Sequence, residues 1–182
     1  MNQRTVNRSF IWVLTSVFLV VAGCQNSETE SAATESPANE AAEQAPDFEV
    51  TTIDGETVSL ASSMEAGRPL VIYFTASWCP VCARNWPVLS EVYPEYSEEL
   101  DLVAISIDPT DTEEVIRDLA NERGFTFPVT RGYPQVMVDY GVPSQASTVG
   151  VNRDGTIEFM IEKTALSSDE FRELFDRLLQ GD

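Results

Sequence analysis

Two continuous apolar runs stand out along the chain. Residues 70–75 (LVIYFT) and 102–107 (LVAISI) hold almost no polar position, which is typical of strands that are buried on both faces of a sheet. Apolar and polar residues instead alternate around an Asp-Gly pair over residues 46–60, and again over residues 148–161. Asp-Gly is a frequent two-residue hairpin turn, so we predict a hairpin at each of these places.

Apolar residues spaced three or four positions apart predict helices between and after these strands. One helix follows the first apolar run and continues to about residue 99, with Pro87 expected to kink it. A second covers residues 111–123, and a short third covers residues 133–140. The last helix begins at Ser167, because a serine followed three residues later by a glutamate forms a capping box.

The order of these elements predicts the fold class. Two strand–helix units are followed by a hairpin and a helix, with residues 127–129 as a short connector or strand between them. This order implies an α/β fold in which helices cover both faces of one central mixed sheet. The hairpin at residues 46–60 is expected to precede that sheet as an N-terminal extension.

The first two dozen residues carry a targeting pattern. Arg4 and Arg8 precede a short apolar run at residues 10–22, which is typical of a secretory signal and shorter than the roughly 20 residues of a membrane-spanning helix. The run ends in VAGC at residues 21–24, which resembles the lipobox of bacterial lipoprotein signals. That resemblance implies cleavage before Cys24 and lipidation of Cys24. The alternative is an uncleaved N-terminal anchor. Both interpretations predict an extracytoplasmic protein tethered to a membrane, on its periplasmic side or at the cell surface.

The chain therefore divides into three parts. We expect a signal peptide at residues 1–23, an acidic tether at residues 24–45 and a folded domain at residues 46–182. The tether has no aromatic and no large aliphatic residue, so it cannot bury enough apolar surface to offset the entropy of the chain. We predict that it is a disordered spacer; a binding segment is the alternative.

Charge and composition exclude several classes of function. Thirty acidic residues against eleven basic ones give a net charge of −19, which argues against binding to nucleic acid or to anionic lipid. The chain has no histidine. A Ser-His or Cys-His catalytic pair and a histidine-ligated metal are therefore excluded.

Cys79 and Cys82 remain once Cys24 is assigned to lipidation, because the chain has three cysteines. They lie at the end of a buried strand and open a helix. There, unpaired N–H groups and the helix dipole favour a thiolate, which is the nucleophile in disulfide exchange. We expect an exposed Cys79 that attacks and a more buried Cys82 that resolves the mixed disulfide. Half of a zinc site and two coincidental core cysteines are the alternatives, and zinc lacks its other ligands here.

The segment FTASWCPVC at residues 74–82 resembles the active-site segment of the thioredoxin superfamily. Together with the signal, the APDF opening at residues 45–48 and the first hairpin, it is most similar to the extracytoplasmic TlpA/ResA-like branch. The resemblance implies a thioredoxin-like fold and a thiol–disulfide oxidoreductase that acts through Cys79 and Cys82. Active-site support is expected from four neighbouring positions, Trp78, Pro80, Val81 and Pro87.

The same resemblance implies the partners of the protein. They are protein thiols and disulfides, with reduction, for example in cytochrome c maturation, as the expected direction and a membrane protein as the electron donor. The redox-active disulfide takes the place of a cofactor, and no metal is expected. Two other functions stay open. One is a peroxidase on the same fold, although Ala76 replaces the threonine of its usual motif. The other is a non-catalytic thiol module that binds apo-proteins or copper.

Three positions depart from the family pattern. Tyr73 stands where thioredoxins carry a buried acid, and Asn85 stands where ResA-like proteins carry a glutamate, so the base for Cys82 is unidentified. A glutamate at position 85 is expected to speed resolution. Ala146 stands where the family has a cis-proline, so we expect a trans peptide there or a shifted register that uses Pro143. The predicted substrate loop comprises Pro143, Gln145, Ala146 and Ser147. Asp108, after the second buried strand, is interpreted as a turn residue before a helix, with a catalytic acid as the alternative.

Overall fold

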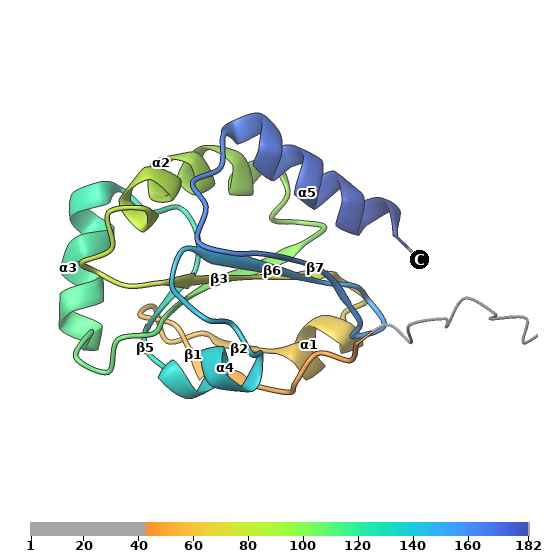
Figure 1. Cartoon of the computed structure of the whole chain (residues 1–182), viewed down its shortest axis with the longest axis horizontal. Coiled ribbons are helices and arrows are strands. Elements are labelled where there is room, and N and C mark those ends of the chain that lie inside the picture. Colours follow the sequence, from red (N-terminus) through yellow and green to blue (C-terminus); the bar gives the residue numbers. More distant parts are fainter. Residues whose placement is uncertain (1–42, 182) are drawn as a thin grey trace, which may run out of the picture. The chain divides into compact units, whose positions relative to one another are not determined.

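The computed structural model describes residues 43–181, and a five-stranded mixed sheet forms their centre (Figure 1). The strand order is β5-β4-β3-β6-β7. Neighbours β3, β4 and β5 run parallel, whereas β6 is antiparallel to both β3 and β7. The predicted α/β class with a mixed sheet is therefore confirmed. The strands are β3 (Leu70–Thr75), β4 (Asp101–Ser106), β5 (Val129–Gly132), β6 (Ser147–Val151) and β7 (Ile157–Ile161).

Helices cover both faces of this sheet, and each face has its own apolar core. One core contains side chains of three helices, α2 (Cys82–Val92), α3 (Glu113–Arg123) and α5 (Ser168–Gln180). The other contains side chains of two shorter helices, α1 (Leu60–Glu65) and α4 (Pro134–Asp139), and of the predicted N-terminal hairpin, β1 (Glu49–Thr51) and β2 (Thr57–Ser59). Figure 1 shows α2 and α5 on one side of the sheet, with α1, α4 and the hairpin on the other.

The central strand β3 explains the long apolar run in the sequence. All six of its residues are buried, since successive side chains point to opposite faces and both faces are covered. Val71 and Tyr73 lie in the core beneath α2 and α5, and Ile72 and Phe74 lie in the other. The strand is thus fixed on both sides just before the cysteines.

Local chemistry sets the helix ends. Ser167 and Glu170 form the predicted capping box at the start of α5. Gly124 ends α3 in the left-handed conformation, with a φ of 66°. However, α3 begins later than expected, because Thr112 and not Asp111 caps it by accepting a hydrogen bond from the N–H of Val115.

Two other boundaries differ from the sequence prediction. The six-residue helix α1 was missed, because its capping box uses Ser59 and Ser62 in place of a glutamate. Helix α2 contains Pro87 as expected but ends at Val92, and a 3₁₀ turn, η1 (Tyr93–Glu95), follows it. The predicted extension to about residue 99 is wrong, since Pro94 has no N–H with which to continue the α-helical pattern.

The folded part of the chain also starts earlier than expected. The carbonyl of Glu43 accepts a hydrogen bond from Ile157, and the N–H of Ala45 donates one to Gly155. Residues 43–45 therefore pair with the β6–β7 hairpin and do not belong to the tether. The signal peptide, Cys24 and the rest of the tether lie outside the described residues. In the described part of the chain, no helix has both the length and the apolar character needed to cross a membrane.

Candidate active site

The two cysteines lie where β3 gives way to α2 and are joined by a disulfide. Their Cα atoms are 5.2 Å apart. The N–H of Cys79 donates to the carbonyl of Ala76, and the carbonyl of Cys79 accepts from the N–H of Ala83. Since this second bond has the α-helical spacing, Cys79 lies in the turn that leads directly into α2, whose first residue is Cys82.

The sulfur of Cys79 lies at the N-terminal end of α2. Its Sγ accepts a hydrogen bond at 3.1 Å from the N–H of Cys82, the first residue of the helix. After reduction, a thiolate at this position faces an N–H donor and the positive end of the helix dipole, and both stabilise negative charge. Pro80 is exposed and lacks an N–H, whereas Val81 is half-buried.

Cys79 is less exposed than expected. Its exposed fraction is 2%, against 0% for Cys82. The prediction of an openly exposed nucleophile is therefore wrong for the disulfide state, because both cysteines pack within the apolar core that contains side chains of α2 and α5. Trp78, next to Cys79, is an exposed large apolar side chain, with an exposed fraction of 58%.

Trp78 is held in place by the loop that follows β4. Its indole N–H donates to Oδ2 of Asp108 at 2.5 Å. The other oxygen of Asp108 accepts hydrogen bonds from the N–H and the hydroxyl of Thr110, which makes the turn expected at this position. These bonds from Thr110, and then the one from Trp78, hold the pKa of Asp108 below its usual value. Asp108 is thus a turn residue that also fixes the exposed aromatic ring.

Asn85 and Tyr73 touch each other one turn beyond Cys82. The Nδ2 of Asn85 donates to the hydroxyl of Tyr73 at 3.1 Å and to the carbonyl of Thr164 at 2.9 Å. Its Oδ1 accepts from the N–H of Leu166 at 2.9 Å. Burial raises the pKa of Tyr73 far above its usual value, against a smaller lowering by the bond from Asn85. Neither side chain supplies a base at neutral pH, and Asn85 instead ties α2 to the loop between β7 and α5.

One buried carboxylate near the cysteine loop, residues 76–81 between β3 and α2, was missed by the sequence analysis. Asp111 is 3% exposed and accepts hydrogen bonds from Ser77, two residues before Cys79. The sequence pattern predicts it only as the first residue of a helix. The only signal for it in the sequence was a polar side chain just after a buried strand, where parallel neighbours place their loops at the same edge.

The substrate loop has a trans peptide at Ala146, in a conformation that proline cannot adopt. The φ of Ala146 is 61°, and no cis peptide bond occurs among residues 43–181. The N–H of Ala146 donates to the carbonyl of Phe74 at 2.7 Å, and its carbonyl accepts from Thr164 at 3.1 Å. Ala146 packs in the same core as Cys79 and Cys82. The trans peptide is confirmed, whereas Pro143 is exposed and does not take the place of the missing proline.

Two other residues of the predicted substrate loop, Ser147 and Gln145, lie beside Ala146 in the sequence. The hydroxyl of Ser147 donates to the carbonyl of Ser144 at 2.9 Å and accepts from the N–H of Lys163 at 3.2 Å. Gln145 is half-buried beside Ala146. Lys163 also has a positive φ, of 47°. Ala146 and Lys163, the two non-glycine residues in this conformation among residues 43–181, therefore lie on loops that are hydrogen-bonded to each other.

Comparison with known proteins identifies the family. The model of the AhpC/TSA family matches residues 41–160, about two thirds of the chain. The chain belongs to the AhpC/TSA family. One relative of this chain is the thioredoxin-like protein YneN of Bacillus subtilis. The two are 30% identical over 117 residues, which are 64% of this chain and 68% of YneN. The thiol-disulfide oxidoreductase ResA of Bacillus anthracis is 28% identical over 116 residues, 63% of this chain and 65% of that protein.

Solved structures share the thioredoxin-like fold of this chain. A thiol:disulfide interchange protein of the thioredoxin family from Chlorobium tepidum has a TM-score of 0.68 and 20% identity, covering 78% of this chain and 99% of its own. A secreted disulfide oxidoreductase of Mycobacterium tuberculosis has a TM-score of 0.62 and 25% identity, covering 72% and 96%. The thioredoxin-like fold and the class of thiol–disulfide oxidoreductase are therefore confirmed.

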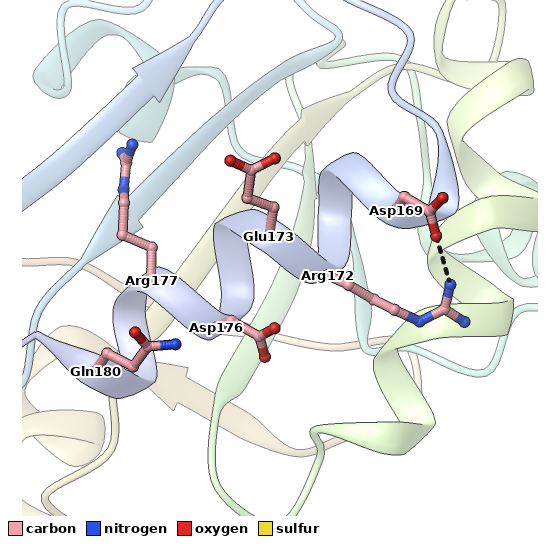
Figure 2. Close-up of a pocket in the computed structure, with 6 residues that line it drawn as sticks. All are labelled: Asp169, Arg172, Glu173, Asp176, Arg177 and Gln180. Atoms are coloured by element: carbon pink, nitrogen blue, oxygen red, sulfur yellow. Dashed lines mark ion pairs between the residues drawn. The ribbon is translucent and has the colours of Figure 1, made fainter.

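A hollow on the protein surface lies away from the two cysteines. This hollow of about 470 Å³ lies along α5 and is lined by charged and amide side chains of that helix alone. Figure 2 shows that they point in different directions from the helix, and that Arg172 is paired with Asp169. Arg172 also pairs with Glu91 and Glu95 on the neighbouring segment, so it docks α5. Among residues 43–181, no group of three or more acidic, cysteine or histidine side chains is placed to hold a metal.

Proposed function

We propose that this protein reduces disulfides in other proteins, with Cys79 as the attacking thiol and Cys82 as the resolving thiol. The observation that carries the proposal is the hydrogen bond from the N–H of Cys82 to Sγ of Cys79, at the start of α2. It gives the first sulfur, and not the second, the surroundings that stabilise a thiolate. The exposed ring of Trp78 beside it offers an apolar contact to a substrate chain.

The reaction moves two electrons from the protein to its substrate. The Cys79 thiolate attacks one sulfur of the substrate disulfide, which forms a mixed disulfide and releases one substrate thiolate. Cys82 then loses its proton to water or to the departing thiolate and attacks Sγ of Cys79. This step closes the Cys79–Cys82 disulfide and releases the second substrate thiol. An external thiol donor must then reduce the pair again, and a membrane protein is the donor that a tethered enzyme would meet.

The proposed place of action is outside the cytoplasm, on a membrane. The lipobox-like residues 21–24 support a lipid anchor at Cys24, with the acidic tether as a spacer. An oxidising compartment supplies the protein disulfides that such an enzyme needs. An apocytochrome c in cytochrome c maturation is one such substrate, as the sequence resemblance suggested.

The alternatives differ in what they require of the cysteine loop. A peroxidase of this fold needs a hydroxyl three residues before the attacking cysteine, and Ala76 there is buried and has none. The hydroxyl of Thr75, next to it, is engaged by the indole N–H of Trp86 at 3.0 Å. A thiol module that binds copper or apo-proteins would need the cysteines but no turnover. Assays of disulfide reduction and of peroxide turnover therefore distinguish both alternatives from a reductase.

Insulin reduction by the full-length protein tests the proposal, with Cys79→Ser and Cys82→Ser as a matched pair. We expect turnover in the native protein only. We expect the Cys82→Ser variant to accumulate a mixed disulfide through Cys79, and the Cys79→Ser variant to trap none. Turnover of hydrogen peroxide without insulin reduction would instead indicate a peroxidase. Stoichiometric Cu(I) binding without either turnover would indicate the non-catalytic module.

A further inference from the structure

The loop after β4 contacts the cysteine loop at two consecutive residues. Asp108 accepts a hydrogen bond from Trp78, and Asp111 accepts two from Ser77. Since β3 and β4 are parallel neighbours, both loops leave the same edge of the sheet. The contacts to Ser77 come two residues before Cys79, in the turn that leads into α2.

Asp111 is a buried carboxylate whose oxygens are occupied. Its Oδ2 accepts from the N–H of Ser77 at 2.9 Å and from the hydroxyl of Ser106 at 2.5 Å, and its Oδ1 accepts from the hydroxyl of Ser77 at 2.6 Å. Within residues 43–181 it has no arginine or lysine as an ion-pair partner, so hydrogen bonds alone compensate the cost of burying it. Burying a charged group costs free energy, and here three hydrogen bonds from Ser77 and Ser106 offset that cost.

The backbone around Asp111 already anchors its own loop. Its N–H donates to the carbonyl of Asp108 at 3.0 Å, and its carbonyl accepts from Gly132 at 2.8 Å. Gly132 packs so closely that a Cβ there would lie 2.0 Å from the carbonyl oxygen of Asp108. Backbone bonds thus already tie this loop to its neighbours, and the carboxylate adds contacts to a different segment, the one that contains Ser77.

We propose that Asp111 is a positioning residue for Cys79. By fixing the backbone and side chain of Ser77, it sets the direction in which the chain enters α2. In the oxidised protein the disulfide itself holds Sγ of Cys79. Once the disulfide is reduced, only the loop keeps that sulfur at the N–H of Cys82, so the carboxylate acts on the reduced form. This inference rests on the proposed attack by Cys79 and adds the group that positions its sulfur.

The test is the rate at which the reduced full-length protein attacks a small neutral disulfide, 2,2′-dithiodipyridine, measured against pH. The variants are Asp111→Asn, Ser77→Ala and their combination, with Ser106→Ala as the matched control. Ser106 bonds to the same carboxylate but does not touch the cysteine loop. Circular dichroism and the thermal midpoint of each variant show that it is folded.

We expect Asp111→Asn and Ser77→Ala each to slow the attack by about tenfold, the effect of losing a hydrogen bond to a charged group. The double variant should be no slower than the slower single variant, because both act through one contact. Ser106→Ala should stay within about twofold of the native rate. If Asp111 acted only through its charge, Asp111→Asn would instead speed the attack, since removing a nearby negative charge favours a thiolate.

The inference is overturned if the three single variants slow the attack equally, if none changes it, or if the effects of Asp111→Asn and Ser77→Ala multiply. Should Asp111→Asn fail to fold, the comparison of Ser77→Ala with Ser106→Ala decides alone, because neither alters a charge. A native protein that fails to react through Cys79 would contradict the proposed function itself. Native reaction with unaffected variants would contradict only the role of Asp111.

Discussion

At the position where the family resemblance led us to expect a glutamate, Asn85 uses its whole amide on its neighbours. Two donors go to Tyr73 and Thr164, and the acceptor takes the N–H of Leu166. A glutamate side chain at neutral pH has no donor, so it would leave the carbonyl of Thr164 unpaired and add a buried charge. The expectation that a glutamate at position 85 speeds resolution therefore conflicts with this geometry, and we expect a loss of stability.

Replacing Asn85 by alanine tests this assignment. The substitution removes the bond to the buried hydroxyl of Tyr73 and leaves the carbonyl of Thr164 and the N–H of Leu166, in part-buried contacts, without partners. A buried polar group left unpaired costs roughly 1–3 kcal/mol. We expect the free energy of unfolding of the oxidised protein in urea to fall by about 3 kcal/mol. Gln135→Ala, which removes an exposed hydrogen bond on α4, should stay within about 0.5 kcal/mol. A loss below about 1 kcal/mol for Asn85→Ala would show that the hydrogen bonds of Asn85 contribute little to stability.

At the scale of elements, the sequence was most informative where one pattern acts alone. The apolar run of β3 and the capping box at Ser167 were enough to place a central strand and the last helix. The loops were beyond such reasoning. Asp111 meets Ser77, 34 positions away, and Asn85 meets Leu166, 81 positions away, through contacts that no local pattern encodes. The short helix α1 was missed because its cap lacks the usual glutamate.

The left-handed conformation of Ala146 gives a prediction about the substrate loop. Proline cannot adopt a φ of 61° and has no N–H for the carbonyl of Phe74, so we expect Ala146→Pro to lower the free energy of unfolding by about 3 kcal/mol or more. Ala146→Gly relieves roughly 1–2 kcal/mol of steric strain, which offsets the entropy that glycine loses on folding.

Ala120→Gly in α3 is the matched control, and it should cost about 1 kcal/mol because its site is helical. Chemical denaturation of the four proteins gives the comparison. A stable Ala146→Pro variant would mean that the loop readily adopts the cis-proline conformation of its relatives. An Ala146→Gly variant as unstable as the control would remove the evidence of strain.

The docking of α5 gives a prediction about pH. The hydroxyl of Tyr96 donates to Asp176 at 2.9 Å, and burial first and this carboxylate second raise the pKa of Tyr96 to about 12. The unfolded chain ionises near pH 10. Because the folded value is the higher one, the stability from this site is complete below about pH 10 and is lost as the pH rises through about 12.

Unfolding in urea at pH 9 and at pH 11.5 measures the effect, with Tyr96→Phe as the comparison. We expect the stability advantage of the native protein over the variant to shrink at the higher pH, since phenylalanine does not ionise. The other buried tyrosines are shared by both proteins and cancel in the difference. A constant advantage at both values would show that the pKa of Tyr96 is not raised by folding.

At the scale of the whole molecule, the domain and its N-terminal segment need separate evidence. The fold and the enzyme class rest on the described residues and on the AhpC/TSA family match, whereas the signal and Cys24 lie outside those residues. The acidic composition sets a further expectation, because a net charge of −19 favours basic protein substrates over acidic ones. It gives no information about the fold itself.

Mass spectrometry of the protein extracted from membranes tests the anchor. We expect a mature N-terminus at Cys24 that carries acyl chains, with the preceding 23 residues removed. A Cys24→Ser variant should lack the acyl chains and partition away from the membrane fraction if it is processed at all. An intact N-terminus that begins at Met1 would contradict the lipoprotein assignment and support the uncleaved anchor.

The central claim is that Cys79 is the activated thiol, and the most direct measurement is alkylation of the reduced protein across pH. Mass spectrometry then resolves the label on each cysteine. Because Sγ of Cys79 faces the N–H of Cys82 at the start of α2, we predict that Cys79 is labelled first, with a midpoint clearly below the ordinary thiol value of about 8.5. Cys82, which is fully buried, should react slowly at every pH. Faster labelling of Cys82, or a midpoint for Cys79 at or above about 8.5, would contradict the account.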